Sequence, residues 1–321
     1  MMAAAPAVTV IALCYNHARF LAQCLDSIAA QTCQDFELIV TDDCSRDESA
    51  ALIAAWLAEH RPQARFIRHE RNAGLCATLN EALAAARGEF ISMIATDDTW
   101  EPDKIARQLA AMRAAPAGTA VVYSDAWQMD EGGTRLAEGF IEHHRPGFAP
   151  PSGRIFAQLA SANFIPAMAT LIRHAALQAA GGYDERLTYE DYDMWLRLAA
   201  EWDFLYCPGK LANYRLVATS IVRTTFRQPP PAHHYTVFLI QEKWLATSLL
   251  SPAQRRQWSE TQWSAAYFLF EQGDPRAPAC LWTAARRTGK PRAWLLAVAS
   301  TLGITRSGAK RALSLFSRRA G

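Results

Sequence analysis

The chain has 321 residues, of which 50% are hydrophobic, and a formal net charge of +2, so it is long enough for a large core or two domains. Its seven cysteines form no Cys-x-x-Cys pair and have no histidine at zinc-ligand spacing, which argues against a zinc site and favours reduced thiols in the cytoplasm. The N-terminus lacks the positively charged region of a signal peptide, and the uncharged run 293–304 is too short to span a bilayer.

Strand and helix patterns alternate over the first hundred residues. The apolar stretches that read as strands are, in chain order, Val8–Cys14, Phe36–Thr41, Arg65–His69 and Glu89–Thr96. Amphipathic stretches between them read as helices, and Ser45–Glu48 reads as a capping box that opens the second helix. Trp100–Lys104 reads as the start of another helix. This alternation predicts a parallel sheet with right-handed crossovers.

Polar side chains follow each of these strands. In chain order they are Tyr15–His17, Asp42-Asp43, Arg71–Gly74 and Asp97-Asp98. The carboxyl ends of parallel strands meet at one edge of a sheet, which is where open α/β sheets bind ligands. Taken alone, Asp97-Asp98 suits a helix cap as well as an oxygen-ligand site for Mg²⁺ or Mn²⁺. Four such segments in succession favour a pocket.

The type of ligand follows from what these turns lack. No glycine fingerprint for a dinucleotide follows the first strand, and no Gly-Lys-Ser/Thr phosphate loop occurs in the sequence. A nucleotide would therefore be held by side chains, with an aromatic ring against the base, carboxylates for base and ribose, and a metal at the diphosphate.

The ordered set of segments resembles the motifs of family 2 glycosyltransferases, which are inverting enzymes with a GT-A fold that use nucleotide-diphospho-sugars. The resemblance covers roughly residues 7–222 and implies an α/β, mostly parallel sheet flanked by helices, with a helical C-terminal extension. The segments that carry it are Ile11–His17, Phe36–Ser45, Arg71–Gly74, Ala95–Asp98, Gly181–Glu185 and Tyr189–Leu198.

The resemblance also implies a role for each site residue. Tyr15 would lie against the nucleobase, Asp43 would hydrogen-bond it with Asp42 nearby, and Arg71 would approach the phosphates. Asp97 would reach the ribose or the sugar, and Asp98 would bind Mg²⁺ or Mn²⁺. Asp191, in the pair Glu190-Asp191, would be the catalytic base, since a carboxylate beside an acceptor hydroxyl can take its proton.

Two positions depart from the usual family pattern. Ala95 stands where the metal motif often has an additional aspartate, and Val217 stands where a histidine often follows the last strand. Both substitutions put metal and phosphate binding in question. Arg215 is left as a candidate phosphate contact, with a surface or structural arginine as an equal alternative.

The function expected from this resemblance is transfer of a sugar from a nucleotide-diphospho-sugar, with UDP favoured, to a saccharide or lipid-linked saccharide, in surface polysaccharide or glycolipid synthesis. A nucleotide-sugar-binding relative with weakened catalysis is the first alternative. The second alternative is a nucleic-acid-binding protein that uses a basic tail. Because the tail has no recognisable binding motif, nucleic acid is not an expected partner. The acceptor loops are expected within Gln128–Ala167, where His143-His144 are contacts, metal ligands or plain exposed histidines.

The C-terminal part differs in charge from the rest. We predict a catalytic domain at 1–225 and a basic, mainly helical region at 226–321, separated near Pro229–Pro231. From Arg276 to Gly321 there are ten lysines and arginines and no acidic residue. This region would lie on anionic lipid at the inner face of the cell membrane, or form an ordinary bundle with a solvated basic face. The apolar residues expected to contact lipid are Trp294, Leu295, Leu296, Leu313, Leu315 and Phe316.

Overall fold

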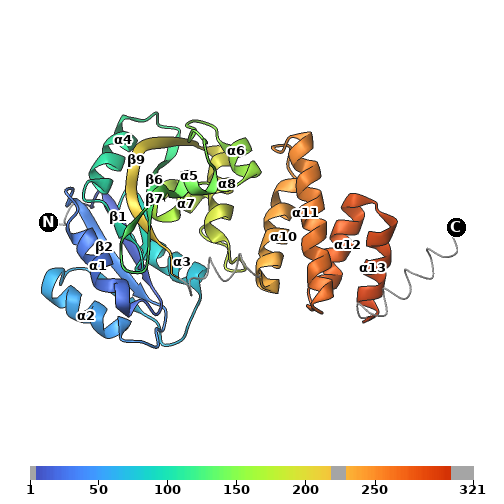
Figure 1. The fold of residues 1–321 in the computed structure, drawn as a ribbon, viewed down its shortest axis with the longest axis horizontal. Coiled ribbons are helices and arrows are strands. Elements are labelled where there is room, and N and C mark those ends of the chain that lie inside the picture. Colours follow the sequence, from blue (N-terminus) through green and yellow to red (C-terminus); the bar gives the residue numbers. More distant parts are fainter. Residues whose placement is uncertain (1–4, 218–228, 305–321) are drawn as a thin grey trace. The chain divides into compact units, whose positions relative to one another are not determined.

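The computed structural model of the chain describes residues 5–217 and 229–304 (Figure 1). The described residues divide into two compact units: the first holds residues 5–185 and 190–217, and the second holds residues 186–189 and 229–304. The predicted boundary between residues 225 and 226 lies within 218–228, outside the described residues, so it stays a prediction.

The first unit is built on a nine-stranded sheet with the order β3-β2-β1-β4-β8-β6-β9-β5, and β7 pairs with β6. Strands β1 to β4 are parallel to one another, as predicted, and so are β6 and β9, whereas β8 is antiparallel to both β4 and β6. In Figure 1 the long β9 curves around the sheet. The strands are β1 Val8–Cys14, β2 Phe36–Asp42, β3 Arg65–Arg68, β4 Phe90–Ala95, β5 Thr99–Trp100, β6 Thr119–Met129, β7 Arg135–Gly139, β8 Thr170–Arg173 and β9 Asp203–Arg215.

Helices of the first unit cover the sheet with their apolar faces. Those of α1, α2 and α4 join β1 and β2 in one core, in which Leu25 and Ile28 of α1 are fully buried. Fully burying one such side chain stabilises the fold by about 2 kcal/mol. The helices are α1 Ala18–Ala29, α2 Ser49–His60, α3 Leu75–Ala85, α4 Lys104–Ala114, α5 Phe140–His144, α6 Phe156–Ser161, α7 His174–Ala179 and α8 Glu190–Glu201, with the 3₁₀ turn η1 at Ala167–Ala169.

Two predicted helix starts are corrected by the structure. The capping box at Ser45–Glu48 does not form, and α2 begins at Ser49. The backbone N of Ser49 donates a hydrogen bond to Asp47 Oδ1 at 3.0 Å. The Ser45 hydroxyl is used elsewhere, as the acceptor for the backbone N of Asn16. The helix expected from Trp100 begins only at Lys104, because Trp100 belongs to the short strand β5, which pairs with β9.

The second unit is helical, as predicted for the C-terminal region. It contains α10 Pro231–Leu245, α11 Pro252–Glu271, α12 Ala277–Thr288 and α13 Pro291–Thr301, which enclose their own apolar core. Each helix has a proline in its first turn, where the missing N–H costs no hydrogen bond. Within the described ranges, no helix is both long and apolar enough to cross a membrane.

Candidate active site

The segments that follow β1, β2 and β4 leave the sheet at the same edge. In the parallel registers Cys14 pairs with Asp42, and Leu13 pairs with Ala95. Just beyond β1 and β2 the chain turns sharply, because Asn16 and Cys44 have positive φ values of 59° and 62°. Few non-glycine residues adopt this conformation, and asparagine does so more readily than cysteine. Strained turns of this kind are concentrated at functional sites.

Hydrogen bonds join the first two turns into one block. The backbone N of Asn16 donates to Ser45 Oγ at 2.8 Å, and the backbone N of Arg46 donates to Asn16 Oδ1 at 2.7 Å. Tyr15 stands on this block with 37% of its surface exposed, which makes its ring available to a planar partner. Its contact with a nucleobase stays a prediction.

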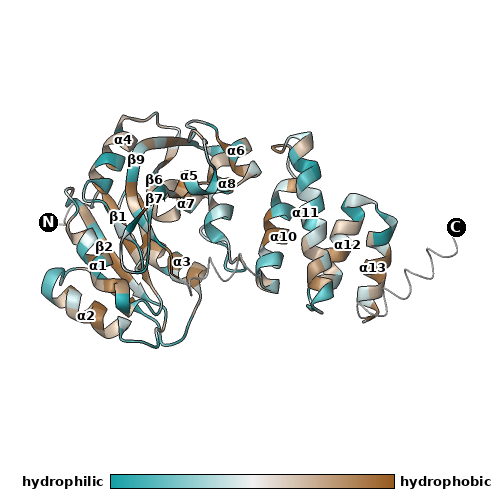
Figure 2. Ribbon diagram, in the orientation of Figure 1, coloured by the Kyte–Doolittle hydropathy of each residue, from teal (hydrophilic) through white to brown (hydrophobic). Residues whose placement is uncertain are grey.

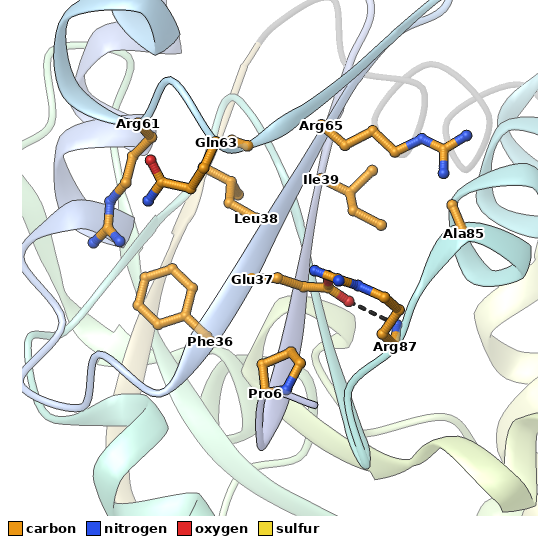
Figure 3. Close-up of a pocket in the computed structure, with 11 residues that line it drawn as sticks. Pro6, Phe36, Glu37, Leu38, Ile39, Arg61, Gln63, Arg65, Ala85 and Arg87 are labelled. Carbon is orange, nitrogen blue, oxygen red and sulfur yellow. Dashed lines mark hydrogen bonds and ion pairs between the residues drawn. The ribbon is translucent and has the colours of Figure 1, made fainter. Parts of the chain in front are cut away.

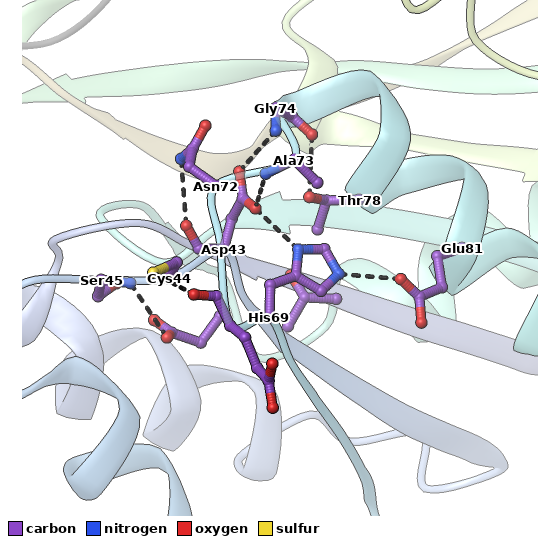
Figure 4. Close-up of polar contacts among 12 residues, drawn as sticks. Asp43, Cys44, Ser45, His69, Asn72, Ala73, Gly74, Thr78 and Glu81 are labelled. Atoms are coloured by element: carbon purple, nitrogen blue, oxygen red, sulfur yellow. Dashed lines mark hydrogen bonds and ion pairs between the residues drawn. The ribbon is translucent and has the colours of Figure 1, made fainter.

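Asp43 is buried and engaged by three N–H groups (Figure 4). His69 Nδ1 donates to it at 2.7 Å, the backbone N of Ala73 at 2.7 Å and the backbone N of Gly74 at 2.9 Å. Ala73 and Gly74 directly precede α3, so this carboxylate satisfies free N–H groups at the start of that helix. Asp43 therefore fixes the loop between β3 and α3.

His69 links this carboxylate to a second one. Its Nε2 lies 2.9 Å from Oε2 of Glu81. Burial alone would lower the pKa of His69, but the hydrogen bonds to Asp43 and Glu81 outweigh burial and raise the pKa above its usual value. No role was assigned to His69 from the sequence. Its place at the end of a predicted strand, just before the Arg71–Gly74 motif, was the available signal.

Asp42 has an oxygen without a protein partner. Its Oδ2 accepts a hydrogen bond from the backbone N of Ser45 at 3.2 Å, whereas its buried Oδ1 has no hydrogen-bond partner within residues 5–217 and 229–304. Leaving a buried acceptor unsatisfied costs about 1–3 kcal/mol, so such an atom is a natural place for a ligand donor. The sequence made Asp43 the base contact and Asp42 its neighbour, but it is Asp42 that has the unpaired oxygen.

Arg71 lies on the loop that Asp43 holds. It is exposed and forms no ion pair with any described residue, including the adjacent Glu70, so its guanidinium is available to an anion. Asn72 on the same loop donates from Nδ2 to the backbone O of Asp43 at 3.1 Å. Gly74 ends the loop with φ +87°, a conformation that favours glycine.

Arg215 holds the turn that carries Asp97 and Asp98. Its backbone N donates to Asp98 Oδ1 at 2.8 Å, and its Nε donates to the backbone O of Asp97 at 2.6 Å. Its other nitrogens donate to Gln23 Oε1 at 2.8 Å and to the backbone O of Glu131 at 3.1 Å. Only 1% of the surface of Arg215 is exposed, so Arg215 is a structural residue. This burial argues against the phosphate contact that the sequence suggested as one alternative.

His17 joins the first turn to Asp97. Its Nδ1 lies 3.0 Å from Thr96 Oγ1, its Nε2 lies 3.8 Å from Asp97 Oδ2, and its backbone N donates to Ser49 Oγ. His17 was noted after the first strand, but its contact with Asp97 depends on the β1–β4 register and was not foreseen.

The carboxylate oxygens of Asp97 and Asp98 suit a hard cation whose other ligands come from a diphosphate. Burial, followed by the Asp97 charge, raises the pKa of Asp98 well above its usual value, and only the Arg215 backbone N–H and side-chain charge oppose this. No described residue donates to Asp98 Oδ2, so that oxygen is available to a metal. Among residues 5–217 and 229–304 no group of three acidic, histidine or cysteine side chains could hold a metal alone. Mg²⁺ commonly needs only one or two carboxylates when substrate phosphates and waters complete its shell.

The segment before α8 is tied to α3 and β4. Asn80 of α3 accepts from the backbone N of Tyr183 at 2.8 Å and donates to its backbone O at 2.9 Å. The Tyr183 hydroxyl lies 3.5 Å from Met93 Sδ in β4. Gly182 has φ +75°, and a Cβ there would lie 2.8 Å from Asn80 Oδ1. These contacts explain the Gly181–Glu185 motif as the support of the helix that follows.

Glu190 and Asp191 open α8 and are half-buried. Burial and the neighbouring Asp191 charge raise the pKa of Glu190 to about 8. Burial also raises the pKa of Asp191 to about 6, although hydrogen bonds from the backbone N of Tyr192 and from Asn163 oppose this. The two carboxyl groups therefore titrate as a coupled pair above their usual range, and the pair can exchange a proton near neutral pH.

The two histidines of the predicted acceptor loops each contact an oxygen of the protein. His143 Nδ1 lies 3.1 Å from Glu138 Oε2, and His144 Nδ1 lies 2.8 Å from the backbone O of Phe140. Both side chains are exposed on α5.

A cavity of about 530 Å³ lies away from these residues (Figure 3). Its lining includes the first residues of β2, whereas Asp42 and Asp43 lie at the opposite end of that strand. Glu37 in its wall is paired with Arg87. The cavity therefore belongs to the other edge of the sheet and is not part of the candidate site.

Comparison with known sequences identifies one family model. The model described as "Glycosyl transferase family 2" matches residues 9–179. The chain is 35% identical over 131 residues to the succinoglycan biosynthesis protein ExoO of Rhizobium meliloti, a match that covers 41% of the chain and 37% of that protein. An uncharacterized protein of Mycobacterium tuberculosis is 29% identical over 276 residues, covering 82% of the chain and 83% of that protein. The chain thus spans only about a third of the first of these relatives.

Comparison with solved structures confirms the predicted fold class. S. aureus TarS 1-349, solved with UDP-GlcNAc, superposes with a TM-score of 0.62 at 17% identity and covers 96% of this chain and 91% of that one. The mannosyltransferase PcManGT from Pyrobaculum calidifontis, solved with GDP-Man and Mn²⁺, gives a TM-score of 0.59 at 18% identity and covers 96% and 83%. At these identities the likeness concerns the fold.

Proposed function

The chain belongs to glycosyl transferase family 2, and from this premise we propose that it moves a sugar from a nucleotide-diphospho-sugar to an acceptor hydroxyl with inversion at the anomeric carbon. We favour UDP as the nucleotide, and a saccharide or lipid-linked saccharide as the acceptor in surface polysaccharide or glycolipid synthesis. The observation that carries this proposal is the contrast between the pair Asp97-Asp98, which suits a cation, and the pair Glu190-Asp191, which suits proton transfer. The UDP-GlcNAc and GDP-Man bound to the structural neighbours, and the succinoglycan role of one relative, support the donor and the pathway.

For the donor, we propose that Tyr15 stacks on the base and that Asp42 accepts its N–H. Uracil presents one ring N–H beside its carbonyl groups, which suits the unpaired Oδ1 of Asp42. Asp43 would act indirectly, because its oxygens already hold the loop that carries Arg71. Arg71 would then reach the phosphates, and Asp97 the ribose or the sugar.

For the leaving group, we propose that Asp98, with Asp97 beside it, holds Mg²⁺ or Mn²⁺. Such an ion would neutralise the charge that grows on the departing diphosphate. The chain contributes a desolvated carboxylate with a free oxygen, held in place by Arg215. Ala95 adds no oxygen ligand, so the cation would depend on the nucleotide for the rest of its shell.

For the acceptor, we propose that Asp191 is the general base. The acceptor hydroxyl gives its proton to Asp191 while its oxygen attacks the anomeric carbon, and the bond from that carbon to the diphosphate oxygen breaks on the opposite face. One displacement of this kind inverts the anomeric centre. Burial raises the pKa of both carboxyl groups, to about 8 for Glu190 and about 6 for Asp191, so the pair suits proton exchange near neutral pH. The resemblance of the motif to the family pattern puts the base at Asp191, the second residue of the pair.

The test is to compare UDP-, GDP-, dTDP- and CDP-sugars for thermal stabilisation of the full chain with and without Mn²⁺, and then to assay transfer. We expect the UDP-sugar to give the largest shift, Mn²⁺ to increase it, and the product to have the inverted anomeric configuration. The absence of any shift with all four donors would overturn the donor assignment. Donor binding without transfer to any saccharide acceptor would instead favour the relative with weakened catalysis.

A further inference from the structure

The last described helix, α13, is apolar on two opposite faces. Its inner face belongs to the core of the second unit through Leu296 and Ala297, and Ala293 on the same face is fully buried as well. Leu296, predicted from the sequence to contact lipid, is therefore unavailable. A soluble amphipathic helix normally has polar residues opposite its buried stripe, but α13 has no charged residue after Arg292.

The outer face of α13 carries four large apolar side chains that are exposed. Trp294, Leu295 and Val298 are 39%, 42% and 45% exposed, and Leu302, just beyond the helix, is 69% exposed. Their spacing places them on one side of the helix. We call these four residues the α13 surface. In Figure 2 the hydrophobic colouring extends along α13.

Positive charge accompanies this surface. Arg286, Lys290 and Arg292, at the end of α12 and the start of α13, are exposed. Residues 276–321 contain ten of the 33 basic residues of the chain and none of its 31 acidic residues, which leaves 23 basic against 31 acidic in residues 1–275. A partner for the α13 surface must therefore offer apolar contact and negative charge together. A second copy of the same surface would bring like charges together, which is unfavourable.

We propose that the second unit docks on an anionic lipid bilayer through the α13 surface. The 11 residues of α13 give a helix about 16 Å long, which is too short to span a bilayer and suits a position along its surface. The four apolar side chains would enter the boundary between headgroups and acyl chains, and Lys290 with its neighbouring arginines would lie against the headgroups. The predicted contacts Leu313, Leu315 and Phe316 lie outside the described residues, and this proposal is independent of the proposed transfer reaction.

The test is co-sedimentation of the full chain with phosphatidylcholine vesicles that contain or lack phosphatidylglycerol. We expect binding only to the anionic vesicles, weakened by added salt. Lys290→Ala and Arg292→Ala should each lower the partition coefficient by about 5-fold, the value of one cation at an anionic surface. The combined variant Leu295→Ser, Val298→Ser, Leu302→Ser should abolish binding.

Matched controls change the same residue types outside the α13 surface. Leu249, which is 45% exposed between α10 and α11, is replaced by serine, and the exposed Arg256 of α11 is replaced by alanine. Both controls should bind vesicles like the unaltered chain, and all variants should keep its melting temperature. The proposal is overturned if the full chain ignores anionic vesicles at low salt, or if the triple serine variant still binds them. A dimer in solution that this variant dissociates would assign the surface to a second copy instead.

Discussion

The acidic pair after β2 and the acidic pair at the start of α8 contain similar carboxylates in different surroundings. Asp43 receives three N–H donors from the loop before α3, at 2.7, 2.7 and 2.9 Å. Asp191 receives the backbone N–H of the adjacent Tyr192 at 2.6 Å and a hydrogen bond with Asn163, and it lies beside the acidic Glu190. Asp43 is supplied with donors by the folded chain, whereas Asp191 is desolvated beside a second acidic side chain.

This difference separates a carboxylate that holds the backbone from one that can exchange a proton. Burial and a neighbouring like charge both disfavour the ionised form, whereas N–H donors favour it. The pKa values of Glu190 and Asp191 are accordingly raised to about 8 and about 6. Asp98 is intermediate between Asp43 and Asp191, because it receives a single backbone N–H, that of Arg215.

The largest effect should come from Asp191→Asn. The amide keeps the shape of the side chain but cannot take a proton, so transfer should fall by about 10²–10⁴-fold. Donor affinity and the melting temperature should stay close to those of the unaltered chain. The measurement is kcat with the acceptor, because donor hydrolysis by water can proceed without the base. Glu190→Gln should reduce kcat less, and the reverse order of the two variants would move the base to Glu190.

Asp98→Ala tests the cation contact proposed for the pair Asp97-Asp98. The variant should lose the part of the nucleotide-induced thermal shift that depends on Mn²⁺ and keep the part seen in EDTA. Each shift is measured from the variant's own nucleotide-free melting temperature, because the variant also loses the hydrogen bond from the Arg215 backbone N. Asp103→Ala, which changes a half-exposed aspartate just before α4, is the matched control and should retain the full shift. A Mn²⁺-dependent shift that persists in Asp98→Ala would assign the cation to other ligands.

Asp43→Asn and Asp42→Asn separate stability from ligand binding within one pair. Asp43→Asn weakens the bonds to the loop before α3 and should lower the free energy of unfolding by about 1–3 kcal/mol in urea titration. Asp42→Asn should change stability less, because it disturbs a single hydrogen bond at 3.2 Å, and should weaken nucleotide affinity more. Equal stability losses with unchanged nucleotide affinity would show that both aspartates serve only the fold.

Glu190→Gln should have the smallest effect, and it depends on pH. The usual pKa of glutamate is 4.5, and that of Glu190 in the folded chain is about 8, so the folded chain binds more protons than the unfolded one between these values. Its stability should therefore fall as pH rises from about 4.5 to about 8. The glutamine variant should show a smaller fall in melting temperature over this range. A pH profile parallel to that of the unaltered chain would mean that Glu190 is not desolvated in solution.

Much of the first unit was accessible from the sequence, because short-range patterns determine it. Short, continuous apolar runs rich in β-branched residues, such as Val8–Cys14, favour strands covered on both faces, and such strands alternating with helices form a parallel sheet. The capping box at Ser45–Glu48 failed because capping depends on where the chain turns, and the positive φ of Cys44 directs Ser45 to the neighbouring loop. The antiparallel insertion of β8 between β4 and β6 was likewise invisible in local patterns.

The sequence by itself determined that carboxylates would gather at one edge of a sheet, because Asp42-Asp43 and Asp97-Asp98 each lie at the end of a strand and parallel strands end together. Only the tertiary structure decided what each carboxylate contacts, because its partners come from distant positions. Asp43 meets His69 and Gly74, and Asp98 meets the backbone of Arg215, 117 residues away. The same holds for α13, whose residues 293–299 are all apolar: packing against the other helices decided that Leu296 is buried and that Val298 and Leu302 are exposed.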